Sequence, residues 1–266
     1  MLLLVLFLPH GMIGYSLLTH EQIVDLAWGD HIEPLLRHRF PNATNDELIE
    51  AHAYAYGGCV IQDLGYYPFG NKDFSNLVHY VRIGDFVASL LQNANDLDEY
   101  AFALGALAHY VSDTDGHPAV NRAVALQYPK LRAKYGDQVT YDENHSAHIR
   151  TEFGFDVVQV AKNRYTSDSY HNFIGFEVSR PLLEKVFRET YGLELQDVFK
   201  NIDLAIGTYR HTVSTIIPEM TRVALVSKRA DLVRENPDFN EHKFLYRLSR
   251  SDYEKQWGKQ IGRAHV

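Results

Sequence analysis

Cysteine is nearly absent from this chain of 266 residues, since Cys59 is the only one. A single cysteine can form no disulfide within the chain and cannot build a cysteine-based zinc site. Cys59 lies in the apolar stretch AYAYGGCVIQ, where we interpret it as a small buried side chain. Any metal site in this protein must therefore use other ligand types.

Positive charge is also scarce. The chain has 26 Lys and Arg against 34 Asp and Glu, which gives a formal net charge of −8, and its Lys and Arg form no long run. A partner held mainly through its phosphate backbone requires a basic stripe on the protein. We therefore expect no stable nucleic-acid partner. Composition leaves the oligomeric state open.

Alternating strand patterns are nearly absent, and apolar residues recur instead with the period of an α-helix. Thr19 is a plausible cap of the first helix, and Thr44 or Asn45 of the second. These patterns predict an all-α fold, a compact multi-helix bundle of about eight helices. The predicted helices cover 21–28, 46–56, 76–91, 97–111 with an extension towards Gly116, part of 145–161, 176–191, 195–216 and 218–228.

Both ends of the chain differ from the middle. Residues 1–14, MLLLVLFLPHGMIG, form an apolar run that is too short to span a bilayer and is interpreted as a signal peptide, which predicts a secreted or periplasmic protein. Residues 229–260 are interpreted as a charged, truncated C-terminal extension. The last six residues, IGRAHV at 261–266, match the translation of a sequencing-adapter stretch and are interpreted as an artefact. Residues 15–228 remain as one all-α domain.

Histidine is abundant, with 14 in the chain, and three polar residues lie four positions apart in GALAHYVSDTDGHP: His109, Asp113 and His117. Four residues advance about 400° on a helix, so such side chains share one face. Gly116 and Pro118 predict that the helix ends there, which leaves the direction of His117 open. A histidine and an aspartate on an apolar face are costly unless they are paired or coordinated. A metal ion between them would explain both.

Further residues of the same types occur elsewhere. His148 and Glu152 form a second pair four residues apart, although such pairs are more often simple helical hydrogen bonds. Asp63 lies where an apolar run meets a Gly-rich turn, His79 lies on an apolar helical face, and His20 lies at the start of the first helix. Taken singly, these three would be a turn residue, a core residue and a surface residue. Taken together, they are the ligand types that zinc prefers in catalytic sites.

The segments YSLLTH, QDLG, LVHY, ALAHYVSDTDGHP and HIRTE together resemble the zinc-dependent phospholipase C family. This family shares its fold and metal site with the zinc-dependent single-strand nucleases. The resemblance runs from Tyr15 to Asp156. It implies up to three zinc ions, one of them bound by the free amino group and carbonyl of the first residue of the mature chain.

The resemblance implies a ligand set, position by position. One zinc would be bound by Asp63, His79, His109 and Asp113. A second would be bound by His117, His148 and Glu152. The third would be bound by His20, a bridging Asp113 and the new N-terminus at Tyr15, which requires cleavage just before Tyr15.

The chain departs from the family pattern in two places. Tyr15 stands where the family usually has Trp, which matters little because the ligating atoms belong to the backbone. The spacing from Asp113 to the next histidine is shorter than usual, so Asp115 is an alternative to His117. His145 is an alternative to His148, but only His148 has a carboxylate one turn later.

A site of this kind predicts a zinc-dependent phosphodiesterase in which a zinc-activated hydroxide attacks the phosphorus. The resemblance implies phospholipase C activity, hydrolysis of the glycerol-side phosphodiester bond of phospholipids, with transient contact to a membrane surface. Asp63 is the catalytic candidate, as the group that orients or deprotonates the attacking water. His52 is a candidate for supporting the ligands. The aromatic candidates for contact with the head group or acyl chains are Tyr66, Tyr67, Phe69 and Phe74, which could equally pack in the core.

Two other functions remain open. A single-strand nuclease would use the same metal site and stacking aromatics, but the acidic balance of the chain and the lack of a disulfide speak against it. A non-catalytic domain stabilised by zinc is the second alternative. It is disfavoured because structural zinc sites are usually closed and rich in cysteine.

Overall fold

The computed structural model describes residues 17–161 and 176–212. Within these ranges the chain forms helices and turns and no strand, which confirms the all-α prediction. None of the described helices is long and apolar enough to cross a membrane. The predicted signal peptide, Tyr15, the helix at 218–228, the extension at 229–260 and the tail at 261–266 all lie outside the described residues.

The helices follow one another with short connections. Those of the first half are α1 (Leu17–Ala27), the π-helix η1 (Trp28–Ile32), α2 (Glu33–Arg39), α3 (Asn45–Ile61), the 3-10 helix η2 (Gln62–Tyr66), α4 (Lys72–Tyr80) and α5 (Ile83–Asn93). They continue with α6 (Leu97–Gln127), α7 (Pro129–Tyr135), α8 (His145–Ala161), α10 (Arg180–Tyr191), α11 (Leu195–Val198) and α12 (Ile202–His211).

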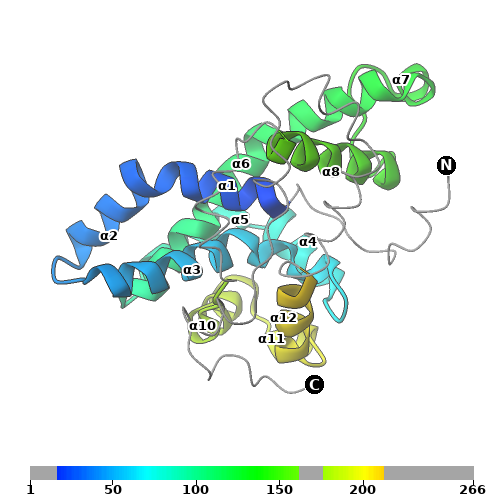
Figure 1. Cartoon of the computed structure of the whole chain (residues 1–266). Helices are drawn as coiled ribbons and strands as arrows, with labels where there is room; N and C mark the ends of the chain where they lie inside the picture. The colour runs from blue at the N-terminus through cyan, green and yellow to red at the C-terminus, as the bar shows by residue number, and fades with distance from the viewer. Residues whose placement is uncertain (1–16, 162–175, 213–266) are drawn as a thin grey trace.

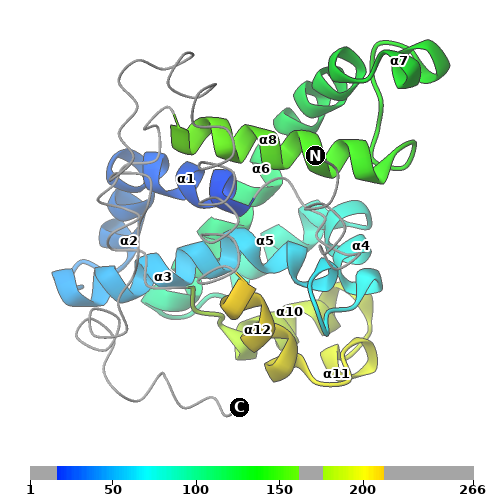
Figure 2. The ribbon, with the colours of Figure 1, turned by 45° about the vertical axis from the view of Figure 1, so that its right-hand side comes forward.

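The centre of the molecule is the crossing of α3 and α6 (Figures 1 and 2). Two glycines make this crossing close. A Cβ atom at Gly58 would lie 1.8 Å from the carbonyl oxygen of Phe102, and one at Gly105 would lie 1.9 Å from that of Ala55. Backbone therefore packs directly on backbone here, and this contact fixes the end of α3 against the middle of α6.

Helix starts agree only in part with the sequence. Thr44 caps α3 in a capping box with Glu47, as one of the two predicted alternatives. The predicted cap at Thr19 is wrong, because α1 begins at Leu17, whose side chain is buried in the core. Burial of this apolar side chain outweighs the local capping preference of threonine.

Two predicted helices are each divided in the structure. The segment 76–91 is α4 and α5, separated at Arg82, which has the left-handed φ of 53°. The guanidinium of Arg82 donates to the carbonyl oxygen of Thr190 at 2.7 Å and to Asp85 at 2.8 Å, so contacts with α10 and α5 hold this turn. The segment 195–216 likewise divides into α11 and α12, with the break at Phe199, which is buried.

The predicted helix end near Gly116 is also wrong, because α6 continues through Pro118 for 31 residues. A proline inside a helix removes one backbone donor and costs about 3 kcal/mol. A second small core stabilises the continuation, where α6 packs with α7 and α8 through Val120, Val124, Ala125, Val139 and Ala147. We call α6 from Gly116 onwards, with α7 and α8, the arm; its α7 end projects from the rest of the molecule in Figures 1 and 2.

Candidate metal centre

Histidines and carboxylates from five helices meet where the arm joins the α3–α6 crossing. His20 comes from α1, Asp63 from η2 and His79 from α4, while α6 and α8 supply the rest. Three groups have all their ligand atoms within 4.8 Å of one another: His20, His109 and Asp113; Asp63, His79 and His109; and His117, His148 and Glu152.

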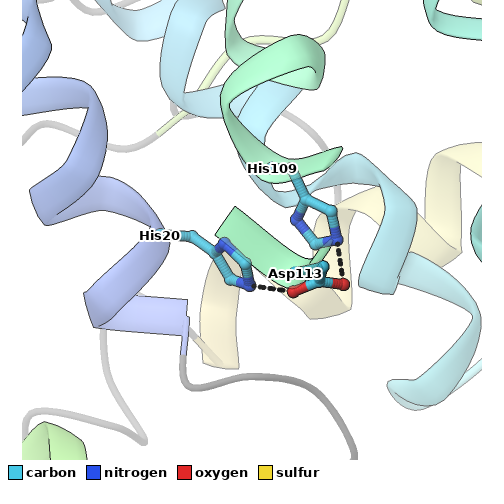
Figure 3. Close-up of side chains that lie close together, drawn as sticks. All are labelled: His20, His109 and Asp113. Atoms are coloured by element: carbon cyan, nitrogen blue, oxygen red, sulfur yellow. Dashed lines mark ion pairs between the residues drawn. The ribbon is translucent and has the colours of Figure 1, made fainter. Parts of the chain in front are cut away.

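Asp113 lies at the centre of this arrangement, with 8% of its surface exposed. Its Oδ1 is 3.5 Å from Nε2 of His20, and its Oδ2 is 3.2 Å from Nε2 of His109. Figure 3 shows these three side chains turned towards one another, from α1 and α6. Oδ2 is also 3.6 Å from Nε2 of His79 and 3.4 Å from Nε2 of His117. One carboxylate therefore contacts histidines of all three groups.

Asp63 and His79 complete the group at the end of α3. Oδ1 of Asp63 is 3.3 Å from Nε2 of His79, and that nitrogen is 3.1 Å from Nε2 of His109. Two imidazole nitrogens and a carboxylate oxygen thus point at one buried spot. This is the arrangement that a cation stabilises, since all three atoms can offer a lone pair.

The group on the arm is built by two helices. His148 and Glu152 lie one turn apart on α8, with Nδ1 and Oε1 separated by 3.0 Å, and both side chains are buried. The ring of His117, on α6, lies 5.7 Å from that of His148. The arm thus carries a histidine–carboxylate group of its own, linked to the rest through Asp113.

Hydrogen bonds to main-chain oxygens fix the rings of two of the histidines. Nδ1 of His79 donates to the carbonyl oxygen of Ser75, and Nδ1 of His109 donates to that of Cys59, each at 2.7 Å. A carbonyl oxygen can only accept, so Nδ1 carries the proton in both rings. In the neutral rings Nε2 is then free of a proton and faces the cluster, which is the state that a metal requires.

Two side chains act in the same way on the other buried rings. Oγ of Ser112 donates to the carbonyl oxygen of His109 at 2.8 Å and contacts Nδ1 of His20 at 3.0 Å, so it accepts from His20. Nε2 of His148 lies 2.9 Å from Oδ1 of Asn121. Each buried histidine therefore has one ring nitrogen bonded outwards and the other facing the carboxylates.

The electrostatics of the cluster favour a cation. Burial lowers the pKa of His20 to about 3. Burial acts in the same direction on His109, but the charge of Asp113 and its hydrogen bond raise the pKa of His109 to about 9. Burial also acts to raise the pKa of Asp113, yet His109 holds it well below its usual range. Asp113 is thus a buried anion that requires positive charge beside it.

Two buried oxygens in the cluster also lack a hydrogen bond. Within the described part of the chain, Oδ1 of Asp113 and Oε2 of Glu152 have no hydrogen-bond partner. Burial raises the pKa of Glu152. Buried polar atoms are normally satisfied, so these oxygens are consistent with an ion as the missing partner. The histidines and carboxylates of the cluster therefore fit zinc.

A family model described as "Zinc dependent phospholipase C" matches residues 19–201. The chain belongs to the zinc-dependent phospholipase C family. The matched range includes the whole cluster and confirms the resemblance recognised in the sequence. Membership shows phospholipase C-type, zinc-dependent hydrolase character at the level of the family. Comparisons with curated proteins and with solved structures found no match.

In this phospholipase C family member, the structure brings together every ligand named from the sequence except Tyr15, which lies outside the described residues. The two alternatives do not lie in the groups: Asp115 and His145 are exposed. His52 lies elsewhere, 3.1 Å from Asp25 and stacked on Trp28. The role of each ligand stays a prediction, but geometry favours His117 over Asp115 and His148 over His145.

The aromatic residues named from the sequence are distributed differently from that expectation. The ring of Tyr66 lies 5.7 Å from that of His79. Phe74 is fully buried against Phe187, and Tyr67 packs on Tyr209, so both belong to the core. Phe69 is 63% exposed and has a left-handed φ of 63°.

Two tyrosines beside the centre were missed. The ring of Tyr80 lies 5.8 Å from that of His79, and its hydroxyl is hydrogen-bonded to Tyr66. The ring of Tyr141 meets that of His148 edge-on at 5.8 Å. Burial raises the pKa of Tyr80 to about 12 and that of Tyr141 above its usual value, so both keep their proton. Tyr80 could have been found from its place directly after His79, whereas nothing local marks Tyr141.

Proposed function

We propose that this protein hydrolyses the glycerol-side phosphodiester bond of phospholipids, releasing diacylglycerol and a phosphorylated head group, and that it does so as a secreted or periplasmic enzyme in transient contact with a membrane surface. The observation that carries the proposal is the convergence of three histidine–carboxylate groups on Asp113. A centre that can hold several cations around one carboxylate suits a phosphodiester, which gains negative charge as it reacts.

Each group would hold one zinc ion. Asp63, His79, His109 and Asp113 would hold the first; His117, His148 and Glu152 the second; and His20, Asp113 and the N-terminus at Tyr15 the third. Zinc bound there would lower the pKa of a coordinated water to about 7 and neutralise charge on the phosphoryl oxygens and the leaving alkoxide.

Asp63 has the position of the group that handles the attacking water. It is 2% exposed and lies at the start of η2, held against α6 by the close α3–α6 crossing. In the proposed reaction its carboxylate orients the water and accepts a proton as the water oxygen bonds to phosphorus. The phosphorus–glycerol oxygen bond breaks, and the alkoxide leaves as the hydroxyl of diacylglycerol after it takes up a proton.

Tyr66, Tyr80 and Tyr141 are suited to contact the substrate. Their rings lie beside His79 and His148, and raised pKa values keep the phenols as hydrogen-bond donors. Neutral donors at this position can bind phosphoryl oxygens, and the rings can bind an apolar or cationic head group.

The test is an assay of zinc-loaded protein on phosphatidylcholine, with release of the phosphorylated head group measured by mass spectrometry. We expect turnover that falls by about 10²-fold or more in Asp63→Asn, because the amide cannot accept the proton. Asp115→Asn, which changes an exposed aspartate of α6, is the matched control and should retain activity. Hydrolysis of single-stranded DNA with no hydrolysis of any phospholipid would overturn the lipid assignment in favour of a nuclease.

A further inference from the structure

The hydrogen bond that fixes His148 differs from those of His79 and His109. The latter two rings donate to main-chain carbonyl oxygens, which exist whatever the side chains are. His148 instead contacts a side chain on the other helix of the arm, with Nε2 2.9 Å from Oδ1 of Asn121. The state of the His148 ring therefore depends on the identity of one residue.

Asn121 continues the stripe that carries the ligands of α6. His109, Asp113, His117 and Asn121 follow one another at intervals of four residues on a helix that is unbroken through Pro118. The carbonyl oxygen of Asn121 also accepts from the backbone N–H of Val139 at 3.1 Å, in the segment that leads to α8. Asn121 thus holds both the segment before α8 and the ring of His148 against α6.

The chemistry at His148 depends on which of its nitrogens carries the proton. The oxygen of a carboxamide can only accept, so a bond from Nε2 to Oδ1 of Asn121 places the proton on Nε2. Nδ1 then faces Oε1 of Glu152 at 3.0 Å as a second lone-pair donor, and it has no hydrogen-bond partner within the described residues. Two such atoms side by side in a buried place leave a position for a cation.

We propose that Asn121 is a positioning residue that holds His148 in the tautomer protonated at Nε2 and so makes Nδ1 available to the second metal group. The inference concerns the zinc group of His117, His148 and Glu152 and therefore rests on the proposed function. Asn121 touches neither the metal position nor the substrate, and it acts only through His148.

The direct test is nitrogen-15 NMR of the metal-free, full chain labelled at histidine. His148 should show the tautomer protonated at Nε2 in the wild type and a mixture or the opposite tautomer in Asn121→Ala. Asn121→Asp keeps an acceptor at the same position and should restore the wild-type tautomer. The matched control is Gln127→Ala, which removes a 3.4 Å hydrogen bond to Thr151 between the same two helices without touching a histidine.

Zinc binding provides a second readout. Loss of the outer hydrogen bond of a metal-binding histidine typically lowers metal affinity by about 10–100-fold. Asn121→Ala should show this loss for one zinc ion per chain, with the affinities of the other ions unchanged, and Gln127→Ala should bind zinc as the wild type does.

A wild-type His148 protonated at Nδ1 would overturn the proposal without any variant, because Asn121 would then present its NH₂ to the ring. An unchanged tautomer in Asn121→Ala would overturn it as well. Neither measurement uses a substrate, so a failure of lipid hydrolysis and a failure of this inference are distinguishable.

Discussion

Asp113 shows at the scale of one residue how the centre is organised. Its two oxygens lie 3.2–3.6 Å from histidine nitrogens of α1, α4 and α6. A buried carboxylate with this many imidazole neighbours cannot be replaced locally, because each neighbour belongs to a different part of the cluster. The consequences of changing it therefore extend to every metal position.

Asp113→Asn is expected to lower zinc content and affinity by more than the roughly 10–100-fold of an outer-shell change, since it removes the shared carboxylate. The fold should persist, because the amide has the same shape. Zinc per chain, measured by elemental analysis, and thermal unfolding followed by circular dichroism check both parts. Asp115→Asn, two residues along α6 and exposed, should behave as the wild type; an equal loss of zinc there would contradict the assignment.

His109 predicts how zinc binding depends on pH. Its pKa of about 9 in the metal-free protein, against an ordinary 6.5, means that it stabilises the metal-free fold fully below pH 6.5 and that this stability is lost as the pH rises to 9. Zinc requires the unprotonated ring, so binding at pH 7 should release a proton from His109 and affinity should rise with pH up to about 9.

Calorimetric titration of zinc in buffers of different ionisation enthalpy measures this proton release. His20, with a pKa of about 3, should contribute no proton at neutral pH. The release should fade above pH 9. Zinc affinity that does not change between pH 7 and 9 would contradict the protonated state of His109.

At the scale of elements, the α3–α6 crossing places the ligands. Gly58 and Gly105 let the two helices touch through their backbones, which sets Asp63, just beyond α3, opposite His109. The hydrogen bond from His109 to the carbonyl oxygen of Cys59 crosses this same contact. The geometry of the metal centre therefore depends on the packing of two glycines that carry no chemistry themselves.

Gly105→Ala is expected to destabilise the fold by about 1–3 kcal/mol or more, because its Cβ would lie 1.9 Å from the carbonyl oxygen of Ala55 and would push the helices apart. Gly84→Ala, in α5, is the control. A Cβ there meets nothing within 4 Å, so it should be neutral or stabilise by about 0.5–1 kcal/mol. Chemical denaturation of both variants provides the comparison, and equal stabilities would show that the crossing tolerates a methyl group.

At the scale of the whole molecule, the metal centre joins two parts of unequal size. The main core extends through α1 to α6 and α10 to α12, whereas the arm has only the small core around Val120, Val124 and Val139. The arm carries His117, His148 and Glu152, and Asp113 lies at its junction with the main core. Zinc bound at the centre would therefore stabilise the arm more than the rest.

Removal of zinc by a chelator is expected to increase amide hydrogen exchange in α8 and in α6 after Gly116 well before it does so in α3, because the arm depends more on the metal than on apolar burial. Hydrogen-exchange mass spectrometry with and without chelator measures this difference. A uniform increase along the chain would show that the arm and the main core unfold together.

The chain should bind about three zinc ions only when it begins at Tyr15. An additional residue before Tyr15 would move the free amino group away from His20 and should remove one ion, with the other two retained. Zinc content of the two preparations, measured side by side, tests the predicted cleavage point. Equal content would mean that the N-terminus is not a ligand.

The sequence by itself determined the helical fold, the ligand types and most of the ligand positions, because the period of 3.6 residues and the cost of polar groups on apolar faces are local properties. It placed His109 and Asp113 on one face, and it recognised His148 with Glu152. Tertiary structure decided where helices begin and end. The continuation of α6 through Pro118, stabilised by packing with α8, brings His117 to Asp113 and Asn121 to His148.

Tertiary structure alone also decided which ligands share a position and which aromatic residues lie beside them. Phe74 and Tyr67 belong to the core, whereas Tyr80 and Tyr141 lie at the centre, and composition treats all four alike. Sequence separation carries no information about a contact such as that between Cys59 and His109, which arises from the close approach of two backbones. The chemistry can be read along the chain, but its arrangement depends on packing between helices that are distant in sequence.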